Sequence, residues 1–404
     1  MSSRPIVYFD NNATTRVAPE VVEAMLPFLR DFWGNPSSAY SFGTYVAGQI
    51  DQAREKVAAL IGADPKEIVF TSCGTESNNA VIESALASQP GKRHIVTTGV
   101  EHSAIIKHCE ILQKRGVEVT SLPVDADGML DLHTLDQSIR HDTALVSVMW
   151  ANNETGMIFP VEEIAAICHS KNVPFHTDAT QVPGKLKMDV HGIGLDFLSL
   201  SAHKLHAPKG IGMLYIKRRA KFQPYLIGGP QEHGKRGGTE NVASIIGFGR
   251  AAELAVAHLN DENTRVRALR DRLETTILTG IPNTIRTGAK EPRLPNTSNI
   301  AFDSVEAEGI LMALDQLGIC ASSGSACTTG SLHPSHVLTA MGIKPARAKG
   351  CVRFSLGIYN TAEEVDYVLK HLPEVIAKLR AAGPHHSHKT RETKHTAEPA
   401  RHAV

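Results

Sequence analysis

The sequence predicts an α/β fold with a mostly parallel β-sheet covered by helices, followed by a smaller α+β region. Short β-rich runs occur at 67–71, 94–97, 144–150, 173–177, 196–201 and 212–216. Helix-like stretches at 76–88, 103–115 and 161–171 separate several of these runs. Each stretch is long enough for the crossover connection that parallel strands require.

The chain of 404 residues is long enough for two domains. From about residue 263 a charged helical stretch is followed by a Pro-rich passage, a helix-like segment from Glu306 and a strand-like run at Val352. We therefore expect a large domain at 16–262 and a small α+β domain formed by 1–15 and 263–382. The His-rich residues 383–404 lack apolar periodicity and are expected to be a disordered tail.

The composition indicates a folded protein and argues against a protein that binds nucleic acid or a membrane surface. With 42 Lys and Arg, 42 Asp and Glu and 42% apolar residues, the chain has no net charge and enough apolar side chains for a core. It offers no electrostatic case for nucleic acid or a membrane surface as partner. The start of the chain has no apolar leader, and six scattered cysteines without a CxxC pair indicate reduced thiols. We expect a cytoplasmic protein.

Two charged residues follow predicted strands and suggest a cofactor. Lys204 follows the run DFLSLS, and Asp178 ends the run VPFHTD. Ligands bind at this edge of an α/β sheet, where an amine can form a Schiff base with an aldehyde. Pyridoxal phosphate needs this pair, because a carboxylate keeps its pyridine nitrogen protonated. The alternatives are an ordinary surface lysine and a helix-capping aspartate.

Other strand ends could hold the rest of such a cofactor. Gly74 and Thr75 stand where a strand meets a helix, a junction suited to phosphate, and Ser201 and His203 flank the lysine. The ring of His102 could stack on a cofactor or carry a proton, although it could equally be an ordinary residue at a helix start. Asn153 and Gln181 also follow strands and could bind the cofactor or the substrate.

Cys327 lies in ASSGSACTTG, a run too polar and Gly-rich to be core. A thiol on such a loop is suited to act as a nucleophile, whereas Cys73, Cys109 and Cys168 lie in or near predicted elements and are expected to be inert. The other interpretation of the small residues is a loop that approaches a phosphate.

In this order the motifs resemble the cysteine desulfurases of the class V aminotransferase family, most closely the type associated with nitrogenase maturation. The resemblance covers the chain to about residue 380 and rests on DNNATT (10–15), GNPSS (34–38), FTSCGTES (70–77), VEH (100–102), NNETG (152–156), HTDATQ (176–181), SAHKLHAPKG (201–210), GGTEN (237–241) and SSGSACTTGSLHPSHV (322–337). It implies the fold of aspartate aminotransferase, known as fold type I of the pyridoxal-phosphate enzymes.

The resemblance also implies a role for each candidate residue. Lys204 carries the cofactor, His102 stacks on its ring, and Asp178 and Gln181 face the pyridine nitrogen and the phenolic oxygen. Gly74, Thr75, Ser201 and His203 hold the phosphate, joined by Thr239 from a second subunit of a homodimer. Asn153 contacts the cofactor and, with Arg353, the substrate carboxylate. Cys327 accepts the sulfur as a persulfide and has a transient contact with iron.

The activity implied is the conversion of L-cysteine to L-alanine, with sulfur passed to an iron–sulfur scaffold protein for nitrogenase maturation. A housekeeping desulfurase, a selenocysteine lyase, an aminotransferase and a sulfur-relay scaffold without turnover are the alternatives. Two residues depart from the family pattern: His233 stands where Arg is common, and Cys351 stands where Thr is expected.

Overall fold

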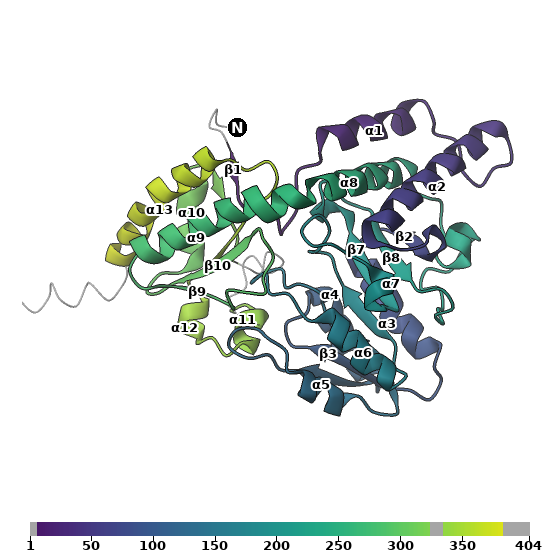
Figure 1. Ribbon diagram of the computed structural model, residues 1–404, viewed down its shortest axis with the longest axis horizontal. Helices are drawn as coiled ribbons and strands as arrows, with labels where there is room; N and C mark the ends of the chain where they lie inside the picture. Colours follow the sequence, from purple (N-terminus) through teal and green to yellow (C-terminus); the bar gives the residue numbers. More distant parts are fainter. Residues whose placement is uncertain (1–5, 324–333, 383–404) are drawn as a thin grey trace, which may run out of the picture.

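The computed structural model describes residues 6–323 and 334–382. Its central sheet has seven strands in the order β2-β8-β7-β6-β5-β3-β4. Figure 1 shows this sheet with helices around it. Their bounds are Ile68–Thr71 (β2), His94–Thr98 (β3), Glu118–Leu122 (β4), Thr143–Ser147 (β5), Phe175–Asp178 (β6), Phe197–Ser201 (β7) and Gly212–Ile216 (β8). The predicted α/β fold with a mostly parallel sheet is therefore confirmed.

Two features of this sheet were not predicted. Strand β8 runs antiparallel to both β2 and β7, because the connection 202–211 is too short for a crossover. Strand β4 was not predicted. It is an edge strand in which only Leu122 is buried, so its sequence lacks the apolar signal of the other strands.

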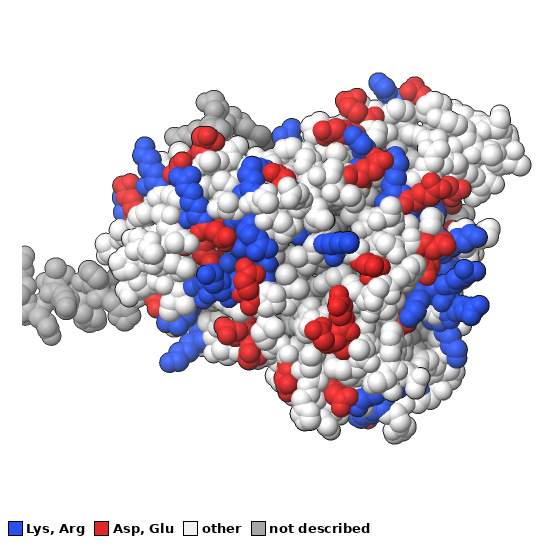
Figure 2. All heavy atoms as spheres, viewed as in Figure 1, with Lys and Arg blue, Asp and Glu red and all other residues white. Residues whose placement is uncertain are grey.

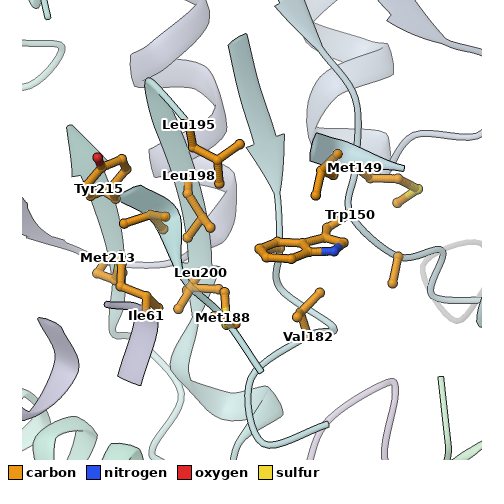
Figure 3. Close-up of a cluster of buried hydrophobic side chains, with 14 of the residues drawn as sticks. Ile61, Met149, Trp150, Val182, Met188, Leu195, Leu198, Leu200, Met213 and Tyr215 are labelled. Carbon is orange, nitrogen blue, oxygen red and sulfur yellow. The ribbon is translucent and has the colours of Figure 1, made fainter. Parts of the chain in front are cut away.

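Helices cover both faces of the sheet, and side chains alternate between two cores. Their bounds are Pro19–Arg30 (α1), Ser41–Ile61 (α2), Gly74–Ala87 (α3), Ser103–Lys114 (α4), Leu132–Ser138 (α5), Val161–Ser170 (α6), Val190–Ile193 (α7) and Val242–Asp261 (α8). Strand β3 shows the alternation: Ile95 packs with residues of α3 and α4, and Val96 packs on the opposite face. Figure 3 shows part of the core to which Val96 belongs, around Trp150, Leu198 and Leu200.

A second unit has a three-stranded antiparallel sheet in the order β12-β10-β9. Its strands are Thr284–Arg286 (β9), Thr297–Phe302 (β10) and Cys351–Ser355 (β12), and its helices are Arg267–Gly280 (α9), Ala307–Asp315 (α10) and Ala362–Ala382 (α13). Phe9, near the N-terminus, belongs to the same core as Phe302 and Phe354. That packing agrees with an N-terminal segment assigned to the small domain, whose boundaries remain a prediction.

Short elements complete the fold. Strand β1 (Val7–Tyr8) pairs with β11 (Ile319–Cys320), and two short helices, His336–Ala340 (α11) and Pro345–Ala348 (α12), precede β12. Helices α8 and α9 form one long run through the π-helical segment Glu262–Val266, which joins the two units (Figure 1). Figure 2 shows acidic and basic side chains mixed over one face of the molecule.

One helical run, Val242–Gly280, is long and apolar enough to pass a length-and-composition test for a membrane span. Half of its most apolar window is buried inside the protein, where α8 packs against α1 and α2. Buried core helices pass the same test, so the observation is weak evidence for a membrane segment.

Candidate active site

Most of the predicted site residues that the structure describes surround one cavity of about 330 Å³. It lies at the carboxyl ends of β6 and β7, where the seven-stranded sheet meets the three-stranded unit. The predicted residues that line it are Gly74, Thr75, His102, Asn153, Asp178, Gln181, Ser201, His203, Lys204 and Arg353. Thr239 lines a separate cavity of about 190 Å³.

The amine of Lys204 points to the N-terminal segment. Strand β7 ends at Ser201, and a 3-10 turn over Ala202–Lys204 places the side chain at the cavity. Its Nζ donates to the carbonyl of Asn12 at 2.6 Å and to that of Ala13 at 2.5 Å. The partly buried side chain is therefore held in a fixed place, which does not fit an ordinary surface lysine.

The carboxylate of Asp178 is buried and held from both sides. It ends β6 and is 6% exposed. The Asn78 side chain donates to its Oδ2 at 2.7 Å, and the Thr180 backbone N–H donates to its Oδ1 at 3.0 Å. No helix begins at this turn, so Asp178 does not cap a helix. The acid and the lysine lie at the same edge of the sheet, as predicted.

The start of α3 offers space for an anion. Helix α3 begins at Gly74, and a Cβ atom there would lie 3.1 Å from Thr180 Oγ1 and 3.4 Å from Ser201 Cβ. A side chain at this position would crowd Thr180, and the N–H groups of the first helical turn favour negative charge. The neighbouring His203 is neutral at pH 7, because burial and Lys204 lower its pKa to about 4.

The ring of His102 is fixed at the start of α4. Its Nδ1 accepts a hydrogen bond from the Ala104 backbone N–H at 3.2 Å, so His102 caps the helix. Burial lowers the pKa of His102, followed by a smaller opposing effect from Asp178. The ring is therefore neutral at pH 7, and its proton lies on Nε2.

Two amide oxygens in the cavity wall have no hydrogen-bond partner among the described residues. Gln181 donates through Nε2 to the Asn12 carbonyl at 3.0 Å, which leaves its buried Oε1 without a partner. Asn78 donates to Asp178 and leaves its buried Oδ1 likewise. Buried polar atoms are normally hydrogen-bonded, so these atoms fit a cavity that takes a polar ligand.

The guanidinium of Arg353 enters the cavity from β12 of the second unit. Arg353 is 1% exposed. It donates through Nη1 to the Asn153 carbonyl at 2.8 Å and through Nη2 to Asp10 Oδ1 at 2.7 Å. The cavity thus contains a cation from one unit and an amine from the other.

Sequence reasoning missed five residues at this site. Asp10, Asn12, Asn78 and Glu154 contact the predicted residues directly or line the cavity. The fully buried Glu101 lies beside His102, and burial raises its pKa to about 8. Asp10, Asn12, Glu101 and Glu154 occur within motifs of the resemblance. Asn78 lies one helical turn after Gly74, a spacing that places both on one face of α3.

The cysteines differ in accessibility. Cys109, Cys168 and Cys351 are buried, which raises the pKa of each thiol to about 12. Cys73 was expected to be inert, but it is partly exposed and lines the cavity. Burial therefore does not protect its thiol. Cys327 and the predicted disordered tail lie outside the described residues. Within residues 6–323 and 334–382, no group of three or more His, Cys, Asp and Glu could hold a metal ion.

Comparison with known proteins places these observations in context. The family model "Aminotransferase class-V" matches residues 7–368. Cysteine desulfurase 2 of Trichormus variabilis is 54% identical over 379 residues, which is 94% of this chain and 95% of the relative. The cysteine desulfurase NifS of Azotobacter vinelandii is 52% identical over 382 residues, with the same coverage of both chains. A solved NifS-like protein is 40% identical with a TM-score of 0.87, over 93% of this chain and 100% of that one.

Proposed function

The chain belongs to the class-V aminotransferase family and is a cysteine desulfurase, and from this premise we propose how its residues act. It uses pyridoxal 5'-phosphate to convert L-cysteine to L-alanine, and it transfers the sulfur to Cys327 as a persulfide. An iron–sulfur scaffold protein then takes the sulfur, for nitrogenase maturation. The observation that carries the proposal is the meeting of Lys204, Asp178 and Arg353 around one cavity.

The residues present fit this cofactor. Asp178 would pair with the pyridine nitrogen, the first turn of α3 at Gly74 would receive the phosphate, and the amine of Lys204 would hold the aldehyde end of the cofactor. His102 offers a flat neutral ring for stacking. When bound, the cofactor supplies an electron sink that lets the Cα atom of cysteine lose its proton.

The chain's own side chains bind and orient the substrate. Arg353 is a buried cation whose planar guanidinium can pair with the cysteine carboxylate, beside Asn153. Neutral His102 presents an N–H donor, because its Nδ1 is already used as an acceptor. Lys204, on the opposite unit, has the amine that would move the proton at Cα.

Sulfur transfer balances without a further reactant. The C–S bond of cysteine breaks, an S–S bond forms to Cys327 Sγ, and the carbon keeps the electron pair and takes the thiol proton to give alanine. The described chain on each side of 324–333 lies at the cavity. Ser322 exchanges backbone hydrogen bonds with Arg353 at 2.6 and 3.2 Å, and Ser335 Oγ donates to Glu154 at 2.5 Å.

The proposal includes a homodimer in which Thr239 completes the phosphate site of the other subunit. Thr239 is exposed in the single chain and lines a cavity beside Ser72, two residues from Gly74. A second groove lies between residues 36–37 and 230–233. Two strongly exposed apolar side chains stand shortly before these residues in the sequence. Trp33, 74% exposed, precedes residues 36–37, and Ile227, 91% exposed, precedes residues 230–233. A subunit interface in this region would cover these exposed apolar side chains.

The alternatives predict different products. A selenocysteine lyase would release selenium from selenocysteine, a plain aminotransferase would need a keto acid and release no sulfide, and a relay scaffold would show no turnover. Comparing sulfur transfer to a nitrogenase-associated scaffold with transfer to a housekeeping scaffold separates the two desulfurase roles.

The decisive experiment is to locate the cofactor. Borohydride reduction of the loaded protein should fix the cofactor to Lys204, and Lys204→Ala should abolish release of alanine and sulfide. The matched variant Lys209→Ala, an exposed lysine five residues further along, should keep both activities. Reduced cofactor on Lys209, or a Lys204→Ala variant that still turns over cysteine, would contradict the assignment.

A further inference from the structure

The segment Asp10–Ala13 joins the two units at the cavity, and Asn12 is its centre. Asn12 is 1% exposed and uses every polar atom it has. Its carbonyl accepts from Lys204 Nζ at 2.6 Å and from Gln181 Nε2 at 3.0 Å. Both donors belong to the seven-stranded unit and face the cavity.

The side chain of Asn12 reaches the other unit. Its Nδ2 donates to Thr297 Oγ1 at 2.8 Å, its Oδ1 accepts from Asn296 at 3.0 Å, and its backbone N–H donates to Ser355 Oγ at 3.0 Å. Nδ2 also donates to the Asn153 carbonyl at 3.1 Å, the same oxygen that accepts from Arg353. One residue therefore contacts the groups that hold the amine and the guanidinium.

We propose that Asn12 is a positioning residue of this active site. Its side chain, locked to Asn296 and Thr297, fixes the plane of its own peptide group, and the carbonyl of that peptide holds the Lys204 amine at the cavity. This inference rests on the proposed function, because it assumes that Lys204 is the residue that bonds to the cofactor aldehyde.

The structural reason is geometric. The lysine side chain has several rotatable bonds, and the carbonyls of Asn12 and Ala13 restrict where its nitrogen lies. A reacting group that is displaced by about 1 Å can lose about a hundredfold in rate. The backbone carbonyl cannot be removed by mutation, but the side chain that orients it can.

Asn11 provides a matched control. It is the same residue type, next in sequence and 9% exposed. Its Nδ2 donates to the carbonyls of Tyr8 and Ser355 and to Asn360 Oδ1. Among the residues that the structure describes, its side chain thus bonds only within the N-terminal segment and the second unit. Asn11→Ala should destabilise the protein by a comparable route without moving the lysine.

The experiment measures cofactor attachment to full-length protein from which the cofactor has been removed, with no cysteine present. The readout is the first-order rate constant at saturating pyridoxal phosphate, followed by absorbance and by borohydride trapping on Lys204. We expect Asn12→Ala to lower it at least about tenfold, Asn12→Ser to lower it less, and Asn11→Ala to change it by less than about threefold. Thermal unfolding of each variant shows the loss of stability separately.

Equal rate constants for Asn12→Ala and Asn11→Ala would overturn the inference, whether both are normal or both are slow. If Asn12→Ala does not fold, the comparison of Asn12→Ser with Asn11→Ala decides in the same way. Failure of the proposed function would look different: the parent protein would not bond the cofactor to Lys204, or would bond it there and release no alanine from cysteine.

Discussion

Replacement of Arg353 by lysine tests the substrate-binding half of the site. Arg353 spans two acceptors from different segments, the Asn153 carbonyl at 2.8 Å and Asp10 at 2.7 Å, and it is 1% exposed. A lysine keeps the charge but has one nitrogen, which cannot reproduce the planar fork. The cysteine carboxylate would then be held by fewer and less directed bonds.

The magnitude follows from the loss of a buried charge-assisted pair. Such a loss costs about 2–4 kcal/mol, or roughly 30- to 1,000-fold in kcat/KM. Most of the change should appear as a higher KM for L-cysteine in steady-state assays of alanine release. The absorbance spectrum of the bound cofactor should stay the same, because Arg353 is assigned to the substrate.

Arg293→Lys is the matched control. Arg293 is 2% exposed and pairs with Glu274 through both terminal nitrogens, at 2.5 and 3.0 Å, but it does not line the cavity. The Arg293→Lys substitution should lower the free energy of unfolding while changing kcat/KM by less than about threefold. If Arg353→Lys also changes kcat/KM by less than about threefold, or no more than the control, another residue holds the carboxylate.

Three further predictions concern the sulfur acceptor, the dimer and a buried acid. Cys327→Ala should abolish persulfide formation but keep the cofactor spectrum, whereas Cys73→Ala should still form a persulfide; mass spectrometry distinguishes the two, and the reverse pattern would reassign the acceptor. Thr239→Ala should weaken cofactor retention in dialysis by roughly 1.5–3 kcal/mol, and a fully active monomer in sedimentation would exclude its proposed role. Burial raises the pKa of Glu101 to about 8, so the folded state holds a proton that the unfolded state loses near its ordinary pKa of about 4.3. The stability that this proton contributes is therefore fully present below the unfolded-state pKa of about 4.3. It is lost as the pH rises from there toward 8, by up to about 1.4 kcal/mol per pH unit. Glu101→Gln should remove this part of the slope in urea unfolding at a series of pH values, and an unchanged slope would show that Glu101 is ionised when folded.

The sequence predicted the parts of the fold that have a strong local signal. Strands such as β5 and β7 are buried at every position, because both faces of the sheet are covered, and three of the five residues in each are apolar. Strand β4 lies at an edge and was missed, since its exposed face removes the apolar pattern. The antiparallel direction of β8 follows from the ten-residue connection between two predicted runs, a signal that the sequence contains but that was not used.

Some residues of the site could likewise be predicted from the sequence, and others could not. Lys204 and Asp178 could be predicted because polar residues directly after buried strands meet at one edge of a sheet. Asp10 could not, because its ion pair with Arg353 joins residues 343 positions apart. The motif DNNATT contributed to the resemblance, but it did not indicate that Asp10 pairs with Arg353. The same holds for Glu154, whose burial depends on contacts with Ser335 and the second unit.

The position of the cavity has an energetic consequence that neither unit alone could produce. Lys204 and Asp178 come from the seven-stranded sheet, whereas Arg353 comes from β12. A ligand that contacts both units holds them together, so its binding stabilises the folded chain across that boundary. At a ligand concentration of 100 times Kd the gain is about 2.7 kcal/mol. Residues that tie the two units, such as Asn12 and Asp10, therefore contribute to ligand affinity and to stability through the same hydrogen bonds. Only variants compared at matched stability, such as Asn12→Ala with Asn11→Ala, can separate the two effects.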